Sequence, residues 1–108
     1  LLYDAAMERI LYDQRPLIHP ASLPHMKERT ITVGAASKEL RMIGWRIGWV
    51  VGPQEVMCDI GLVSISNVVC QAGISMAGVA AGLNTFDDGL NEALEIWEQR
   101  RNILLKEF

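Results

Sequence analysis

The stretch TITVGAASKELRMIGWRIGWVV, residues 30–51, decides the fold of this chain. Thr30 to Val33 is β-branched throughout and predicts a strand, and Trp45 to Val51 predicts a second strand. Only Gly34 to Gly44 separates the two, whereas a parallel crossover needs about a dozen residues or more. We therefore expect the chain to return antiparallel after a tight turn that contains Lys38.

The segment before this stretch predicts a third strand and a long loop. Leu1 to Tyr3 is a short apolar run that indicates the end of a buried strand, and Asp4 follows it directly. Residues 5–12 predict a helical turn or irregular structure. Asp13 to Pro24 contains three prolines, which remove backbone donors and predict a loop.

The segment after this stretch predicts three helices. Pro53 suits the start of a helix that runs to about Leu62 or beyond. Residues 71–83 are rich in alanine and glycine and predict a helix that packs tightly against its neighbours. Asp87 or Asp88 could cap a last helix, which carries one apolar stripe at helical spacing. The stripe comprises Leu90, Ala93, Leu94, Trp97, Arg101 and Leu104, and the opposite face, expected in solvent, carries Glu92, Glu95, Glu98 and Arg100. Strands that alternate with helices predict an α/β protein.

Composition excludes several classes of function. Of the 108 residues, 50% are hydrophobic and 21% are charged, which is typical of a globular protein. The net charge of −3 and the lack of a basic block give no support to nucleic-acid binding or to attraction by a membrane surface. The two cysteines, Cys58 and Cys70, have no metal-ligand spacing, and we expect buried free thiols in a reducing compartment, the cytoplasm.

Lys38 and Arg46 carry the clearest chemical signal. Lys38 lies in a turn of small residues, and Arg46 follows eight residues later between two glycines. A lysine amine can form a Schiff base with an aldehyde, and a guanidinium grips a phosphate with a rigid fork of donors. The pair therefore suits the covalent capture of a phosphorylated aldehyde.

The run Ser37-Lys38 followed by Gly44-x-Arg46-x-Gly48-Trp49 resembles the cofactor-lysine motif of pyridoxal-phosphate-dependent aminotransferases of the aspartate aminotransferase-like family (class I/II, fold type I). The resemblance covers most of the chain and is strongest over residues 1–53. It implies pyridoxal 5′-phosphate as the cofactor and Lys38 as the catalytic Schiff-base residue. It also implies that Arg46 and Ser37 hold the phosphate.

The segment that begins at Asp4 resembles a second family motif, Asp-x-x-Tyr. The aspartate of that motif pairs with the protonated ring nitrogen, so the resemblance assigns this role to Asp4. Two residues depart from the family pattern. Met7 stands where a tyrosine usually donates a hydrogen bond to the cofactor's ring oxygen, and Ala35 lacks a hydroxyl that some members use on the phosphate.

The resemblance also implies an organisation larger than this chain. The chain begins at Leu1 within a strand, so we expect it to be a segment of a longer protein and inactive by itself. Residues 1–86 would form the C-terminal part of a mostly parallel sheet layered with helices, within the large cofactor-binding domain. Residues 87–108 would form a helix leading toward a small domain. Family members share their sites across a homodimer, so we expect one here.

Three functions remain open from the sequence. The first is transamination between an amino acid and a 2-oxo acid, and the second is a β-lyase or related reaction of the same fold. The third is a segment that has lost its activity, with Met7 as the feature that points to it. His19 and His25 lie in the proline-broken loop without the partner spacing of a triad or a metal site, so we expect no metal.

Overall fold

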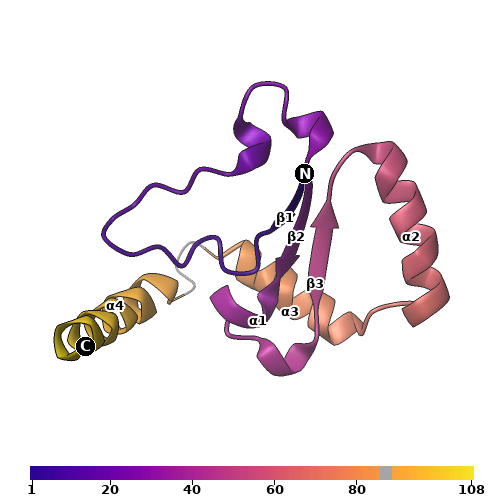
Figure 1. The fold of residues 1–108 in the computed structure, drawn as a ribbon. Coiled ribbons are helices and arrows are strands. Elements are labelled where there is room, and N and C mark those ends of the chain that lie inside the picture. Colours follow the sequence, from indigo (N-terminus) through magenta and orange to yellow (C-terminus); the bar gives the residue numbers. More distant parts are fainter. Residues whose placement is uncertain (86–88) are drawn as a thin grey trace.

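The computed structural model describes residues 1–85 and 89–108, and these form a small sheet with helices around it (Figure 1). Three strands lie in the order β1-β2-β3, with β2 in the centre. They are β1 (Leu2–Asp4), β2 (Ile31–Ala35) and β3 (Gly48–Val51). β1 and β2 are parallel, and β3 returns antiparallel to β2, as the length of the connection predicted.

The register of the sheet decides which residues meet at its edge. Asp4, the last residue of β1, pairs with Val33 of β2. Ala35, the last residue of β2, pairs with Gly48, the first residue of β3. The carboxyl ends of β1 and β2 and the amino end of β3 therefore lie at one edge of the sheet.

The long connection from β1 to β2 is irregular, as its prolines predicted. It contains only two short 3₁₀ turns, η1 (Pro20–Ser22) and η2 (Lys27–Arg29), and it loops away from the sheet (Figure 1). The His19 side chain caps the first of these turns, because its Nδ1 accepts the N–H of Ala21 at 3.1 Å.

The turn between β2 and β3 contains a single helical turn, α1 (Ala36–Glu39), and a 3₁₀ turn, η3 (Ile43–Trp45). The prediction that the second strand begins at Trp45 was wrong. The strand begins at Gly48, because Arg46 adopts a left-handed backbone conformation that interrupts the extended chain. Arg46 therefore lies outside the sheet and just before the strand.

Three longer helices follow the sheet: α2 (Gln54–Val68), α3 (Gly73–Leu83) and α4 (Leu90–Glu107). Pro53 occupies the capping position of α2, close to the expected helix start. The predicted capping aspartates, Asp87 and Asp88, lie outside the described residues. Gly89, with φ of +70°, precedes the first residue of α4. Among the described helices, none is both long enough and apolar enough to span a membrane.

Among the described residues, few apolar side chains are buried. They are Ala5, Ala36, Val79, Leu90 and Ala93. Two expectations of burial were wrong, because Leu2 of β1 is 71% exposed and both cysteines are exposed as well as free. In the described sheet β1 is an outer strand, and it pairs with one strand only.

The predicted stripe of the last helix is buried only at its start. Leu90 and Ala93 are buried and Trp97 is half-buried, whereas Leu104 near the end is 58% exposed. Glu98 departs from the solvent face on which it was predicted. Its carboxylate accepts the backbone N–H of Asp13 at 2.8 Å, and this bond joins α4 to the loop after β1.

Candidate functional site

The residues predicted from sequence gather at one edge of the sheet. Asp4 ends β1, Lys38 lies in the helical turn that directly follows β2, and Arg46 lies two residues before Gly48, the first residue of β3. Because β1 and β2 run parallel and β3 runs antiparallel, all three positions fall at the same edge. The sheet thus brings the carboxylate of Asp4, which is distant in the sequence, into the same region as the amine of Lys38 and the guanidinium of Arg46.

Lys38 lies on a rigidly held turn. Ala36, the first residue of α1, is fully buried and its N–H donates to Ile47 O at 3.2 Å, which closes the base of the loop. Lys38 itself is exposed and Ser37 is half-buried. The backbone of this turn is therefore anchored, while the lysine amine remains accessible to a ligand.

Arg46 is one of the non-glycine residues with a positive φ, at φ 51° and ψ 53°. Such a conformation is uncommon outside glycine, asparagine and aspartate, and strained residues of this kind cluster at ligand sites. The side chain is exposed, and its Nη1 donates to Ile43 O at 2.7 Å. The other N–H groups of the guanidinium can still reach an anion.

Helix α3 supports the loop that carries Lys38 and Arg46, and it lies beneath this end of the sheet (Figure 1). Ser75 is buried and its hydroxyl donates to Trp45 O at 3.0 Å. A Cβ added to Gly78 would lie 3.2 Å from Met42 Cε, and one added to Gly82 would lie 3.2 Å from Leu40 Cδ1. The glycines therefore allow the loop to approach this face of the helix closely. The prediction of tight packing holds for this face only, because Ile74 and Leu83 of the same helix are exposed.

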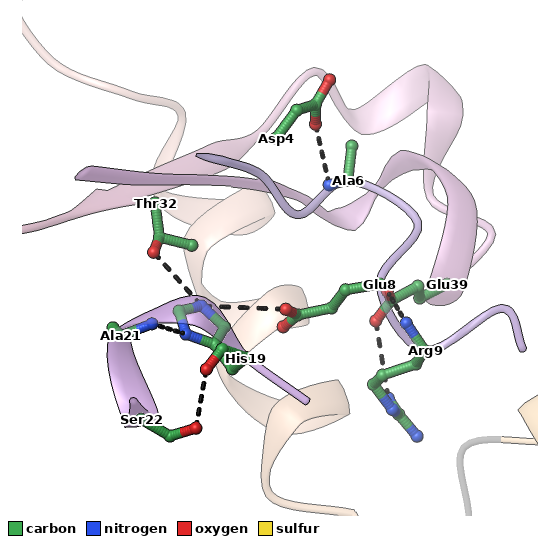
Figure 2. A network of polar contacts seen from close by, with 9 residues as sticks. All are labelled: Asp4, Ala6, Glu8, Arg9, His19, Ala21, Ser22, Thr32 and Glu39. Atoms are coloured by element: carbon green, nitrogen blue, oxygen red, sulfur yellow. Dashed lines mark hydrogen bonds and ion pairs between the residues drawn. The ribbon is translucent and has the colours of Figure 1, made fainter. Parts of the chain in front are cut away.

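Asp4 begins a turn that leaves the sheet. Its Oδ1 accepts the N–H of Ala6 at 2.9 Å, and its exposed carboxylate can still accept a hydrogen bond from a ligand (Figure 2). Met7 lies in the same turn and is 58% exposed, so the departure from the family tyrosine lies on the surface. Ala35 is half-buried at the end of β2.

Two charged neighbours of Lys38 were not predicted from sequence. Glu39 is buried, and its Oε1 accepts the backbone N–H of Arg9 at 2.8 Å (Figure 2). Arg41 reaches the start of α4: its Nη2 would lie 2.7 Å from a Cβ on Gly89. Neither contact has a local sequence signal, because each joins residues far apart in the chain.

His19 takes part in a network of polar contacts that joins the β1–β2 loop to β2 (Figure 2). Because its Nδ1 accepts a backbone N–H, the neutral ring carries its proton on Nε2, which donates to Thr32 Oγ1 at 3.2 Å. Glu8 Oε2 lies 3.8 Å from the same nitrogen. The ring of Tyr3 packs edge-on against His19, and burial raises the pKa of the Tyr3 hydroxyl, as do the charges of nearby carboxylates.

The donor set at the sheet edge fits pyridoxal phosphate. An accessible amine suits the aldehyde, a guanidinium with free donors suits the phosphate, and a strand-end carboxylate suits a protonated ring nitrogen. Within residues 1–85 and 89–108, no group of three or more histidine, cysteine, aspartate or glutamate residues could hold a metal ion. The chemistry that these residues can support is therefore covalent capture of a carbonyl together with binding of an anion.

The whole chain, residues 1–108, matches the family model described as aminotransferase class I and II. The chain therefore belongs to the class I and II aminotransferase family. Aspartate aminotransferase of Rhizobium meliloti (strain 1021) is 39% identical over 106 residues, which cover 97% of this chain. Kynurenine–oxoglutarate transaminase 1 of Homo sapiens is 39% identical over 77 residues, which cover 71% of this chain and 18% of that protein.

Solved structures agree with this placement. The crystal structure of the aspartate aminotransferase from Rhizobium meliloti matches 97% of this chain with a TM-score of 0.92 and 36% identity. An aromatic aminotransferase from Pyrococcus horikoshii OT3 matches the same share with a TM-score of 0.92 and 29% identity. These matches confirm the predicted α/β fold and the predicted aspartate aminotransferase-like family. The chain spans only 26% of the length of the Rhizobium meliloti enzyme.

Proposed function

We propose that the full-length protein is a pyridoxal-phosphate-dependent aminotransferase that exchanges an amino group between an amino acid and a 2-oxo acid. The observation that carries this proposal is the position of Asp4, Lys38 and Arg46 at a single edge of the sheet. The similarity to proteins named aspartate aminotransferase and kynurenine–oxoglutarate transaminase supports the same reaction class.

Each residue of the proposed site has a separate task. Lys38 Nζ would hold the aldehyde carbon of the cofactor and would move the proton at the α-carbon of the amino acid. Arg46 binds the phosphate through its guanidinium, and the Ser37 hydroxyl adds a further donor. Asp4 keeps the ring nitrogen protonated by placing a negative charge beside it.

When bound, pyridoxal phosphate supplies an electron sink for the charge that develops at the substrate α-carbon. The exposed side chain of Lys38 and its anchored backbone suit this chemistry, because the amine must move while its attachment point stays in place. Met7 cannot donate a hydrogen bond to the cofactor, so we expect weaker tuning of the Schiff-base nitrogen than a tyrosine would give.

The first test compares three forms of the full-length protein with added pyridoxal phosphate: wild type, Lys38→Ala and Lys106→Ala. Lys106 lies in the last turn of α4 and serves as the matched control. We expect a visible absorbance band in the wild type and in Lys106→Ala but not in Lys38→Ala. Borohydride should lock the cofactor onto Lys38. If the wild type lacks a band that depends on Lys38, the proposal is refuted, and the result favours a site that has lost its activity.

A second test separates transamination from β-elimination. The full-length protein is incubated with a panel of amino acids and 2-oxoglutarate, and its products are analysed. Glutamate as the product supports transamination, whereas ammonia with pyruvate from a β-substituted amino acid supports a lyase of the same fold. We expect glutamate.

We further propose that the full-length protein is a cytoplasmic homodimer. Family resemblance motivates the dimer, and sedimentation of the full-length protein tests it, since a monomer would refute it. The free thiols of Cys58 and Cys70 suit a reducing compartment. Cell fractionation tests this location, and recovery outside the soluble cytoplasmic fraction would refute it.

A further inference from the structure

Glu39 is a buried carboxylate directly beside the proposed Schiff-base lysine. Only 8% of the residue is exposed, whereas Lys38 before it is exposed and Leu40 after it is half-buried. Burying a charged group is costly unless it is paired and hydrogen-bonded. Glu39 is the last residue of the single helical turn α1, and its burial therefore requires specific partners.

One partner of Glu39 is Arg9, which lies 30 residues earlier in the chain. Its Oε1 accepts the backbone N–H of Arg9 at 2.8 Å, and its Oε2 lies 3.9 Å from Nη1 of the same arginine (Figure 2). The short bond to the backbone is the more important contact, because the Arg9 guanidinium is exposed and its ion pair is weakened by solvent. Through this bond, Glu39 holds a point of the backbone.

That point belongs to the turn that starts at Asp4. The turn is fixed at its first residues, because the N–H of the buried Ala5 donates to Val33 O at 2.8 Å and the N–H of Ala6 donates to the Asp4 carboxylate. The bond from Arg9 to Glu39 fixes its other end. The turn that carries Asp4 is therefore tied to β2 at one end and to α1 at the other.

We propose that Glu39 is a positioning residue. It holds the turn that starts at Asp4 in a fixed position relative to α1, the helical turn that contains Lys38. Asp4 and Lys38 must act on the same ring, one at its nitrogen and one at its aldehyde carbon, so a change in their relative position weakens both contacts at once. In this proposal Glu39 acts through the two turns and is not one of the residues that contact the cofactor or the substrate. This inference rests on the proposed function, because it assumes that Asp4 and Lys38 serve one cofactor.

The test compares Glu39→Gln with Glu39→Met in the full-length protein. Both replacements have nearly the length of glutamate, but only glutamine keeps a strong acceptor for the Arg9 N–H. Two quantities are measured: the Kd for pyridoxal phosphate and the pH midpoint of the Lys38-dependent absorbance band. The midpoint reports the charge on the ring, and a loss of general stability alone does not shift it.

We expect Glu39→Gln to keep both quantities near the wild-type values. Glu39→Met should raise the Kd about tenfold, in line with the loss of a hydrogen bond to a charged acceptor. It should also move the midpoint to higher pH. If Asp4 is displaced, the ring becomes less cationic. The nitrogen linked to Lys38 then keeps its proton up to a higher pH.

A purely structural role predicts a different pattern, in which Glu39→Met lowers thermal stability and leaves both the Kd and the midpoint unchanged. That result would overturn the inference while the proposed function stands. If the wild type instead lacks the Lys38-dependent absorbance band, both this inference and the proposed function are overturned. Should Glu39→Met fail to fold, Glu39→Asp withdraws the acceptor by one methylene while keeping the charge, and its Kd and midpoint are expected to change in the same directions.

Discussion

Ala35 lies opposite Gly48 in the last pair of the antiparallel β2–β3 ladder. A backbone hydrogen bond of 3.2 Å just outside this pair extends the ladder by one step. The chain leaves the sheet toward Lys38 on one side of the pair and returns from Arg46 on the other. The two residues with the clearest chemical signal therefore lie on the two arms of one loop whose base is hydrogen-bonded, and α3 supports that loop from below.

Arg46→Lys should weaken the binding of pyridoxal phosphate in the full-length protein by about tenfold or more. Lysine keeps the positive charge but loses the planar fork that binds a phosphate with two donors. The matched control is Arg41→Lys. Arg41 also has a positive φ, but its guanidinium lies beside Gly89 at the start of α4.

The Kd for the cofactor is measured for both variants by equilibrium dialysis. We expect Arg41→Lys to bind the cofactor nearly as the wild type does. Equal losses in the two variants would contradict the assignment of the phosphate to Arg46, because they would indicate a general effect of positive charge near the loop.

Gly34→Ala should destabilise the full-length protein by about 1–3 kcal/mol. The indole of Trp49, the cross-strand partner of Gly34, occupies the space that a Cβ would need. The added methyl group must therefore displace the ring from the face of the sheet. Thermal unfolding measures the loss, and the tryptophan emission of the folded state should shift with it.

Gly44→Ala is the control for that substitution. A Cβ on Gly44 would meet nothing within 4 Å in the part of the chain that the structure describes. We expect a change of less than about 0.5 kcal/mol. If both alanine variants lost equal stability, the contact with Trp49 could not be the cause.

The presence of three strands and the antiparallel return of the last one could be predicted from local chemistry. The β-branched run at residues 30–33 has few alternatives to a strand, and the short connection after it leaves no room for a parallel crossover. The stripe on α4 was equally clear from its spacing as far as Arg101. These features depend on residues close together in the sequence.

The backbone of Arg46 and the burial of Glu39 could not be predicted in this way. The alternation of glycine and large residues from Gly44 to Trp49 suits an extended strand. In the structure Arg46 is left-handed instead, and the carbonyl of Trp45 before it accepts the Ser75 hydroxyl of α3. Glu39 follows Lys38 without any periodic signal. Its partner, Arg9, becomes a neighbour only after β1 and β2 pair.

Ser75→Ala should lower stability by about 1 kcal/mol, because the Trp45 carbonyl loses its donor from a buried hydroxyl. Ser66→Ala is the matched control. The Ser66 hydroxyl donates to Leu62 O of its own helix at an exposed position, where water can replace it. Thermal unfolding of the full-length protein checks both variants, and an equal effect of the two would mean that the Ser75 bond does not stabilise the loop.

The contact between Asp13 and Arg101 predicts a specific pH dependence. Hydrogen bonds from the Arg101 guanidinium lower the pKa of the Asp13 carboxyl from 3.8 to about 2. The guanidinium donates to both carboxylate oxygens and lies 5.0 Å from the centre of the Tyr12 ring. Because the folded-state pKa lies below the unfolded value, the stabilisation is complete above about pH 4 and is lost as the pH falls through about 2.

Asp13→Asn should therefore be less stable than the wild type near neutral pH, and the difference should shrink between about pH 4 and about pH 2. The difference should be small, because the pair is solvent-exposed, and it should shrink further in high salt. Asparagine tolerates the positive φ of Asp13, so the substitution tests the charge rather than the backbone. Denaturant midpoints across this pH range measure the effect, with Asp59→Asn on the exposed face of α2 as the control. A difference between wild type and Asp13→Asn that stays constant as the pH falls would show that the ion pair does not hold α4 against the loop after β1.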